Sequence, residues 1–384
     1  MSAAGTADTG APAASAPVID PAADQRFMEL ALTLGRRGLG NTWPNPAVGA
    51  VIVKDGVILG RGWTQPGGRP HAETEALKQA GRAARGATLY VTLEPCSHQG
   101  KTPPCADAII RAGIARVVSA LDDPNPEVAG QGIARLRERG IAVETGFGAE
   151  AARRAHIGHS ARITQARPHV TLKLALSADG KAGGAGRKPV AITGPAARER
   201  VFQMRAMNDA ILVGMGTVLS DDPALTCRLS GMMNRSPVRV LLDARLRVPI
   251  ASGVVATANE TPTWIFGDLK ASTLAEEVLR AKGAEVLRVE AKEGRLDLAA
   301  LLKLLAERGI TRLMVEGGPT VAASFAKADL VDEAVLFRAP KEIGADGVDA
   351  LDGMPLTALT RSTRLKLLAS ETIGEDTVEY YERA

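Results

Sequence analysis

Two α/β domains in tandem are the fold class that this sequence predicts, and three observations support it. The chain has 384 residues, of which 45% are hydrophobic, whereas a single core usually stops growing at about 250 to 300 residues. Segments with strand and helix periodicity alternate through both halves. A helical stretch gives way to a strand pattern at Arg167-Pro168. We therefore expect a disordered tail over residues 1–24, a first domain over 25–166 and a second domain over 167–384.

The first domain is expected to open with a helix. Apolar residues at helical spacing predict it from Phe27 to Leu39. The β-rich runs Val48–Val53 and Val57–Gly62 flank Asp55-Gly56, a dipeptide typical of a tight hairpin. The alternation then continues and predicts a mostly parallel sheet covered by helices. The further segments are helix 72–80, strand 88–92, helix 105–112, strand 115–120 and a helix at about 150–165.

The second domain is expected to begin with the strand His169–Leu176, which ends at Asp179-Gly180. Helical segments separate most of the strands that follow, so a second α/β sheet is predicted. We see no internal repeat that relates the two halves. The further strands are expected at 210–213, 238–242, 263–266, 285–289, 312–315 and 333–337.

Composition and charge limit the partners. A net charge of +4 and an aromatic share of 3% suit a phosphorylated small molecule better than a nucleic acid. Three cysteines that form no disulfide framework indicate a reducing compartment. Residues 1–24 lack the basic start and apolar centre of a signal peptide, and no apolar run approaches about 18 residues. We expect a cytoplasmic protein that binds neither nucleic acid nor membrane, and a homo-oligomer stays open.

A zinc site is predicted by His71, Cys96 and Cys105. One imidazole and two thiolates leave the fourth tetrahedral position open for water, which is typical of a catalytic site. The helices expected after His71 and at Cys105 direct their positive ends toward the metal. Glu73 stands two residues after the histidine, where a carboxylate can exchange protons with the water and with a departing amine.

Each of these residues alone has a plainer interpretation. A histidine before a helix is usually a polar surface or core residue, and intracellular cysteines are usually small buried apolar side chains. The ordered combination of His71-Ala72-Glu73, Pro95-Cys96 and Cys105 favours the metal. Its chemistry is that of the nucleobase deaminases with a His-x-Glu and Pro-Cys signature.

Three further segments, 45–53, 92–105 and 123–126, carry a more specific resemblance. With the second half, they make residues 25–384 similar to the bifunctional riboflavin-biosynthesis deaminase/reductase family. The resemblance implies a cytidine-deaminase-like α/β/α domain followed by a dihydrofolate-reductase-like α/β domain. It implies hydrolysis of the 2-amino group of 2,5-diamino-6-(5-phosphoribosylamino)pyrimidin-4(3H)-one, and then NADPH reduction of the ribosyl group to a ribityl group.

The resemblance also implies which residues of the first domain contact the substrate. Asn45 would bind the pyrimidine edge, and His98, Lys101, Asp123 and Asn125 would contact the ribose or phosphate. Lys101 is a point charge in a Gly- and Pro-framed loop, which suits a phosphate; a solvated loop lysine is the alternative. His98 as a fourth zinc ligand is disfavoured, because it would close the position needed for water.

Two glycine-rich turns in the second domain, Ile211–Val218 and Leu313–Thr320, follow predicted strands and can bring the backbone close to a ligand. Neither is a Rossmann fingerprint. Resemblance to the family's reductase half, through 173–180, 219–228 and 315–320, implies an NADPH site. Its lining would be Ala175, Thr217, Asp221 and Gly318, and the phosphoribosyl substrate would be held by Arg205, Leu225, Arg228 and Glu316.

Plainer interpretations and departures bear on this second site. Instead of binding substrate, Arg205 could be an exposed helix residue. Instead of binding the cofactor, Asp221 could cap a helix or turn. Cys227 is expected to be a small buried side chain. The family commonly has Ser-x-Trp-Ile-Thr where this chain has Pro189–Thr193, and Asp-Ser where it has Asp243-Ala244.

Two other functions compete with the bifunctional enzyme. The first is a zinc deaminase of a nucleoside or tRNA whose C-terminal domain only binds or regulates. Binding to tRNA would depend steeply on salt, which a charge of +4 does not favour. The second is a scaffold with structural zinc, and Glu73 argues against it because a structural site needs no such carboxylate.

Overall fold

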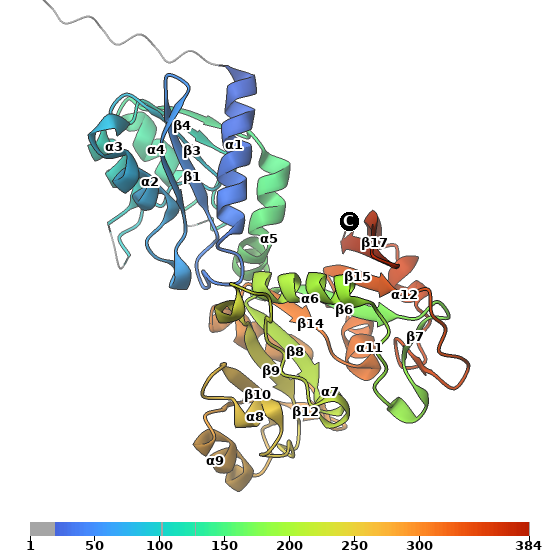
Figure 1. The fold of residues 1–384 in the computed structure, drawn as a ribbon. Helices are drawn as coiled ribbons and strands as arrows, with labels where there is room; N and C mark the ends of the chain where they lie inside the picture. Colours follow the sequence, from blue (N-terminus) through green and yellow to red (C-terminus); the bar gives the residue numbers. More distant parts are fainter. Residues whose placement is uncertain (1–19, 101–102, 127, 384) are drawn as a thin grey trace, which may run out of the picture.

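The computed structural model describes residues 20–100, 103–126 and 128–383. It consists of two α/β domains that follow one another along the chain (Figure 1). The expected fold class is therefore confirmed. Among the helices of the described residues, none is both long and apolar enough to cross a bilayer.

The first domain is built on a five-stranded sheet with the order β2-β1-β3-β4-β5. Strand β1 is antiparallel to both of its neighbours, whereas β3, β4 and β5 run parallel. The expected tight hairpin is present, with Asp55 (φ 50°) and Gly56 (φ 75°) at its turn. Strand β1 runs opposite to the other four, so the sheet is mostly parallel, as expected. The strands are β1 Gly49–Lys54, β2 Val57–Trp63, β3 Thr88–Val91, β4 Arg116–Ser119 and β5 Ala142–Thr145.

Helices cover both faces of this sheet. Apolar side chains of α2 (Ala72–Ala80), α3 (Cys105–Ala112) and α4 (Gln131–Glu138) form a core on one face. Helices α1 (Pro21–Arg36) and α5 (Ala149–Gln165) pack on the other face, where they lie side by side (Figure 1). The result is the expected three-layer α/β/α arrangement.

Helix α1 corrects the expected limits of the N-terminal tail and of the first helix. It begins at Pro21 after the cap Asp20, so residues 21–24 are helical and not part of a tail. The carboxylate of Asp24 is buried and accepts hydrogen bonds from Arg116 at 2.7 and 2.8 Å and from Tyr90 at 2.6 Å. These bonds explain why the helix extends beyond its apolar pattern. The expected tail over residues 1–19 lies outside the described part of the chain.

The second domain contains a nine-stranded sheet with the order β11-β10-β9-β8-β14-β6-β15-β18-β17. All neighbours from β11 to β15 are parallel, and β18 and β17 continue the sheet as an antiparallel hairpin. This hairpin was not predicted. The strands are β6 His169–Leu176, β8 Ala210–Gly214, β9 Val238–Leu242, β10 Thr263–Asp268, β11 Glu285–Val289, β14 Arg312–Val315, β15 Glu333–Arg338, β17 Leu365–Ile373 and β18 Asp376–Arg383.

The alternating side chains of these strands fill a core on each face. Helices α10 and α11 pack on one face, and α6 to α9 on the other. The helices are α6 Pro195–Met207, α7 Met215–Asp221, α8 Gly253–Ala256, α9 Thr273–Ala281, α10 Leu298–Glu307, α11 Pro319–Lys327 and α12 Thr357–Thr360. Two short ribbons pair β7 Lys181–Gly183 with β16 Val348–Asp349, and β12 Ala291–Lys292 with β13 Arg295–Leu296.

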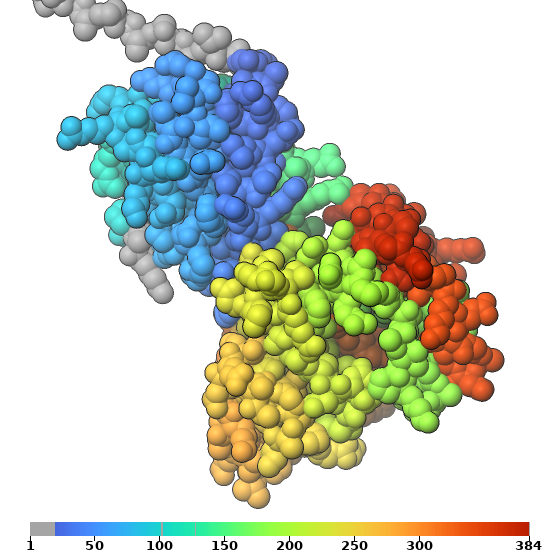
Figure 2. Space-filling view, viewed as in Figure 1, coloured from blue at the N-terminus to red at the C-terminus, as the bar shows by residue number. Residues whose placement is uncertain are grey.

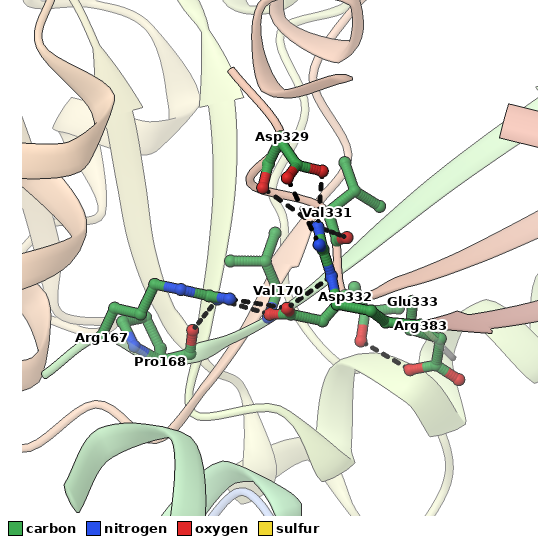
Figure 3. Close-up of polar contacts among 9 residues, drawn as sticks. Arg167, Pro168, Val170, Asp329, Val331, Asp332, Glu333 and Arg383 are labelled. Atoms are coloured by element: carbon green, nitrogen blue, oxygen red, sulfur yellow. Dashed lines mark hydrogen bonds and ion pairs between the residues drawn. The ribbon is translucent and has the colours of Figure 1, made fainter. Parts of the chain in front are cut away.

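One carboxylate joins the start of the second domain to its end. Asp332 accepts hydrogen bonds from both terminal nitrogens of Arg167, at 2.5 and 2.7 Å, and from the backbone nitrogen of Val170 at 2.9 Å (Figure 3). The backbone nitrogen of Arg383 donates to the carbonyl of Asp332 at 2.8 Å, while its guanidinium binds Asp329. Asp332 thus holds both the segment before β6 and the end of β18.

Candidate metal centre and second-domain pocket

His71, Cys96 and Cys105 lie together in the first domain although 34 positions separate the first from the last. His71 immediately precedes α2, Cys105 is the first residue of α3, and Cys96 follows β3 by five residues. The Nδ1 atom of His71 is 3.7 Å from Sγ of Cys96 and 3.3 Å from Sγ of Cys105. The three ligand atoms all lie within 4.8 Å of one another. One nitrogen and two sulfurs at this spacing fit a tetrahedral zinc ion with one open position.

The surroundings of the two thiols shift their pKa values in opposite directions. Hydrogen bonds from the Cys105 thiol and from His71 lower the pKa of Cys96 to about 4, against the effect of burial. The bond to Cys96 and burial together raise the pKa of Cys105. The backbone nitrogen of Cys105, at the start of α3, also donates to Sγ of Cys96 at 3.3 Å. These contacts favour a thiolate at Cys96, and a divalent metal would hold both cysteines as thiolates.

Glu73 lies in the first turn of α2, two residues beyond His71, and is only 4% exposed. Burial raises its pKa, although attraction to His71 opposes the shift. A carboxyl group with a raised pKa beside an open metal position can take up a proton from bound water and release it again.

Glu94 is a buried residue that sequence reasoning missed. Its two carboxylate oxygens accept four backbone hydrogen bonds, of 2.8 to 3.2 Å, from residues 123, 130, 132 and 133. Glu94 thereby fixes the loop between β4 and α4, which carries Asp123 and Asn125. It stands two positions before Cys96, and no periodicity or spacing in the sequence marks it for this function.

The residues expected to contact the deaminase substrate have different environments. Asn45 is half-buried and donates through Nδ2 to the carbonyl of Gly68 at 2.7 Å. Asp123 lies 3.8 Å from Nε2 of His159. Burial alone would raise the pKa of Asp123, but the nearby His159 and the hydrogen bond from the backbone nitrogen of Asn125 lower it. His98 is exposed, and Lys101 lies outside the described residues.

A cavity of about 900 Å³ opens in the second domain between the two glycine-rich turns. Among the described residues, its lining includes Thr217, Asp221 and Gly318 of the expected NADPH site, but not Ala175. Oγ1 of Thr217 accepts a hydrogen bond from the backbone nitrogen of Gly318 at 3.1 Å, which joins the turn after β8 to the turn after β14. The departures from the family pattern also fall on this wall, since Pro189, Val190 and Ala244 line it.

The expected reductase substrate residues lie outside that lining, within the described part of the chain. Nε and Nη2 of Arg205 bind both oxygens of Glu316, at 2.8 and 2.9 Å, so Arg205 is not an exposed helix residue. Leu225 is buried with a positive φ of 55°, and Arg228 is exposed. Cys227 is buried, as expected.

Lys173 was not singled out among the candidate side chains from the sequence. It lies on the inner strand β6, and its Nζ is 5.7 Å from the ring centroid of Phe337. Burial lowers the pKa of Lys173, while attraction to Glu316 opposes the shift. Lys173, Arg205 and Glu316 thus form one charged cluster. A lysine between two leucines of this strand was the available signal, because a charge drawn into the interior requires a partner.

Comparison with known proteins connects both halves to one family. Residues 21–121 match the model "Cytidine and deoxycytidylate deaminase zinc-binding region", and residues 168–379 match "RibD C-terminal domain". The riboflavin biosynthesis protein RibD of Aquifex aeolicus is 43% identical over 94% of this chain and 98% of its own length.

Solved structures agree over nearly the whole chain. One form of Acinetobacter baumannii RibD superposes with a TM-score of 0.84 at 35% identity, covering 95% of this chain and 100% of that one. A diaminohydroxyphosphoribosylaminopyrimidine deaminase/5-amino-6-(5-phosphoribosylamino)uracil reductase from Thermotoga maritima gives 0.82 at 34% identity, with coverages of 95% and 99%. The family resemblance and the two cofactors that it implies, zinc and NADPH, are confirmed. The chain therefore belongs to the RibD family of riboflavin biosynthesis, as a bifunctional enzyme with a zinc-binding deaminase domain and a reductase domain.

Proposed function

We propose that the first domain hydrolyses the 2-amino group of 2,5-diamino-6-(5-phosphoribosylamino)pyrimidin-4(3H)-one and that the second reduces the product's ribosyl group to a ribityl group. The observation that carries the proposal is the convergence of His71, Cys96 and Cys105 beside the buried Glu73. The deaminase and reductase activities for which the Thermotoga maritima relative is named support the choice of substrate. The domains extend over residues 25–166 and 167–384, apart from the helical residues 21–24 that join the first.

In the deaminase site, His71, Cys96 and Cys105 would hold zinc, which supplies Lewis-acid activation of a water molecule. Glu73 accepts a proton from that water and returns it to the departing amine, so ammonia leaves as a neutral molecule. Its burial favours this function, because a carboxyl group with a raised pKa takes up the proton more readily.

Substrate recognition in the first domain is assigned to polar residues on three segments. Asn45 faces the pyrimidine edge, with its orientation set by the hydrogen bond to Gly68. Asp123 and Asn125, on the loop fixed by Glu94, contact the ribose or phosphate together with His98 and Lys101, and Lys101 supplies the positive charge. The backbone bonds to Glu94 hold this loop in place before substrate binds, which reduces the entropic cost of binding.

In the reductase site, NADPH supplies the hydride. Thr217, Asp221 and Gly318 at the cavity, together with Ala175, are assigned to the cofactor. Glu316, Arg228 and Leu225 are assigned to the substrate. Arg205 acts mainly through Glu316, because two nitrogens of its guanidinium already bind that carboxylate. Arg228 is therefore the better candidate for the 5-phosphate.

The test is an assay of the purified full-length protein with the diaminopyrimidine substrate, with and without NADPH. We expect ammonia release in both cases and NADPH oxidation only when the deaminated product is present. Ammonia release without NADPH oxidation would leave a deaminase with a C-terminal binding module. Deamination of a nucleoside or tRNA in place of this substrate would refute the assignment. The proposal places the enzyme in the cytoplasm, without nucleic-acid or membrane partners; a homo-oligomer is compatible with it.

A further inference from the structure

The loop that carries Asn45 rests directly on the second domain. The two domains touch where the loop after α1 meets α6 (Figures 1 and 2). Gly40 has a φ of 74°, and a Cβ atom on it would lie 2.4 Å from the carbonyl oxygen of Ala206, so the backbones of the two domains are in contact. No larger side chain fits at Gly40 without moving one domain.

Aromatic packing extends this contact toward Asn45. Trp43 packs against the apolar core of the second domain. Its ring meets the ring of Trp264, on β10, edge to face, with centroids 6.4 Å apart and an angle of 86° between the planes. Trp43 stands two positions before Asn45, so the support given by Trp264 acts on the same short loop.

A polar contact fixes the other end of the loop. Nη2 of Arg235, in the second domain, donates to the carbonyl oxygen of Leu39 at 2.5 Å. Burial lowers the pKa of Arg235, and its Nε has no hydrogen-bond partner among the described residues. Holding a half-buried guanidinium in this position is costly unless its bond to Leu39 is maintained.

The loop is in turn bonded to the segment that leads to the metal ligand His71. The backbone nitrogen of Gly67 donates to the carbonyl of Asn41 at 2.8 Å, and Asn45 binds Gly68 at 2.7 Å. Gly67 and Gly68 precede His71 by four and three residues. A continuous set of contacts therefore runs from Arg235 and Trp264, through the loop, to the deaminase site.

We propose that Arg235 and Trp264 of the reductase domain are positioning residues for the deaminase, which fix the loop 39–45 and thereby the orientation of Asn45 toward its substrate. The inference rests on the function proposed above, specifically on Asn45 as a substrate-binding residue. It means that the deaminase site is complete only when the reductase domain is docked on it.

The test uses the full-length protein with the substitution Arg235→Met, which removes the donor and keeps an unbranched apolar side chain. Arg247→Met, at an exposed arginine of the same domain, is the matched control. Trp264→Phe is a second variant that conserves most of the packing. We expect Arg235→Met to raise the deaminase KM about three- to tenfold, the range for loss of one hydrogen bond. The deaminase kcat, the zinc content and the melting temperature should stay near those of the control, and Trp264→Phe should raise KM less.

Other outcomes separate the two proposals. A deaminase KM unchanged in both Arg235→Met and Trp264→Phe, with an active parent enzyme, would overturn the positioning inference alone. An equal rise in Arg247→Met would also overturn it. A parent enzyme that releases no ammonia would instead overturn the proposed function.

Discussion

Arg205 and Glu316 face each other through two nearly parallel hydrogen bonds, from Nε to Oε1 at 2.8 Å and from Nη2 to Oε2 at 2.9 Å. Both side chains are mostly buried. Burial would raise the pKa of Glu316, but attraction to Arg205 and to Lys173 keeps it below its usual value. The carboxylate thus stays ionised, and its orientation depends on the planar guanidinium.

Replacement of Arg205 by lysine should therefore impair the reductase although the charge is retained. A lysine cannot donate in the same fork, so Glu316 loses its fixed orientation. We expect NADPH oxidation to fall at least about tenfold in kcat/KM, with ammonia release unchanged. Steady-state kinetics of both reactions measure this, and unchanged reductase kinetics would remove Arg205 from the site.

The substitution Glu73→Gln tests the proton-transfer function in the first domain. The amide keeps the size of the side chain but cannot carry the proton, so ammonia release should fall by about a hundredfold or more. Zinc content should stay near one per chain. Glu75→Gln, in the same turn of α2, is the control and should retain activity. Loss of zinc together with activity in Glu73→Gln would mean that Glu73 holds the metal site together.

Removing the Thr217 hydroxyl tests the cofactor pocket. In Thr217→Val the backbone nitrogen of Gly318 loses its acceptor, so the two glycine-rich turns are no longer joined. We expect the KM for NADPH to rise about tenfold, the cost of one unsatisfied backbone donor. Thr217→Ser keeps the hydroxyl and should restore most of the affinity. Equal KM values for the serine and valine variants would disprove the importance of this bond.

Two buried histidines predict how stability depends on pH. Burial lowers the pKa of His156 to about 3 and that of His169 to about 4, both from an ordinary value of 6.5. In the unfolded chain they take up protons below pH 6.5, whereas the folded protein keeps them neutral, so the unfolding free energy should decrease as pH falls from 6.5 toward 4. Each histidine contributes at most about 1.4 kcal/mol per pH unit.

Denaturant unfolding at pH 7, 6 and 5 measures this dependence. We expect the free energy of unfolding to decrease with each step to lower pH. His169→Gln removes one of the two titrating groups and should reduce the slope between pH 6 and 5. A free energy of unfolding that stays constant over this range would show that the two imidazoles are protonated in the folded protein.

Buried, regular elements were predictable from the sequence. Strands β6, β9, β11 and β14 and helices α2 and α3 have the predicted limits, because their apolar residues are buried in the core of their own domain. Strand β17 was missed because most of its residues are exposed, so it carries no apolar alternation. Helix α4 was missed as well, and so was strand β5, whose residues are exposed or half-buried.

The site could be predicted only where the ligands lie in a local motif. His71, Cys96 and Cys105 stand out by residue type and order, and they do converge. Glu94 and Lys173 did not stand out, because their functions depend on partners brought close by the fold. The contact between Arg235 and Leu39 joins residues 196 positions apart, which sequence patterns cannot reveal.

X-ray absorption at the zinc edge of the purified protein tests the proposed metal centre most directly. We predict two sulfur ligands at about 2.3 Å and two nitrogen or oxygen ligands at about 2.0 to 2.1 Å, one from His71 and one from water. A Cys96→Ser variant should lose one of the two sulfurs. A shell of four sulfurs, or zinc without any sulfur ligand, would contradict the assignment of His71, Cys96 and Cys105.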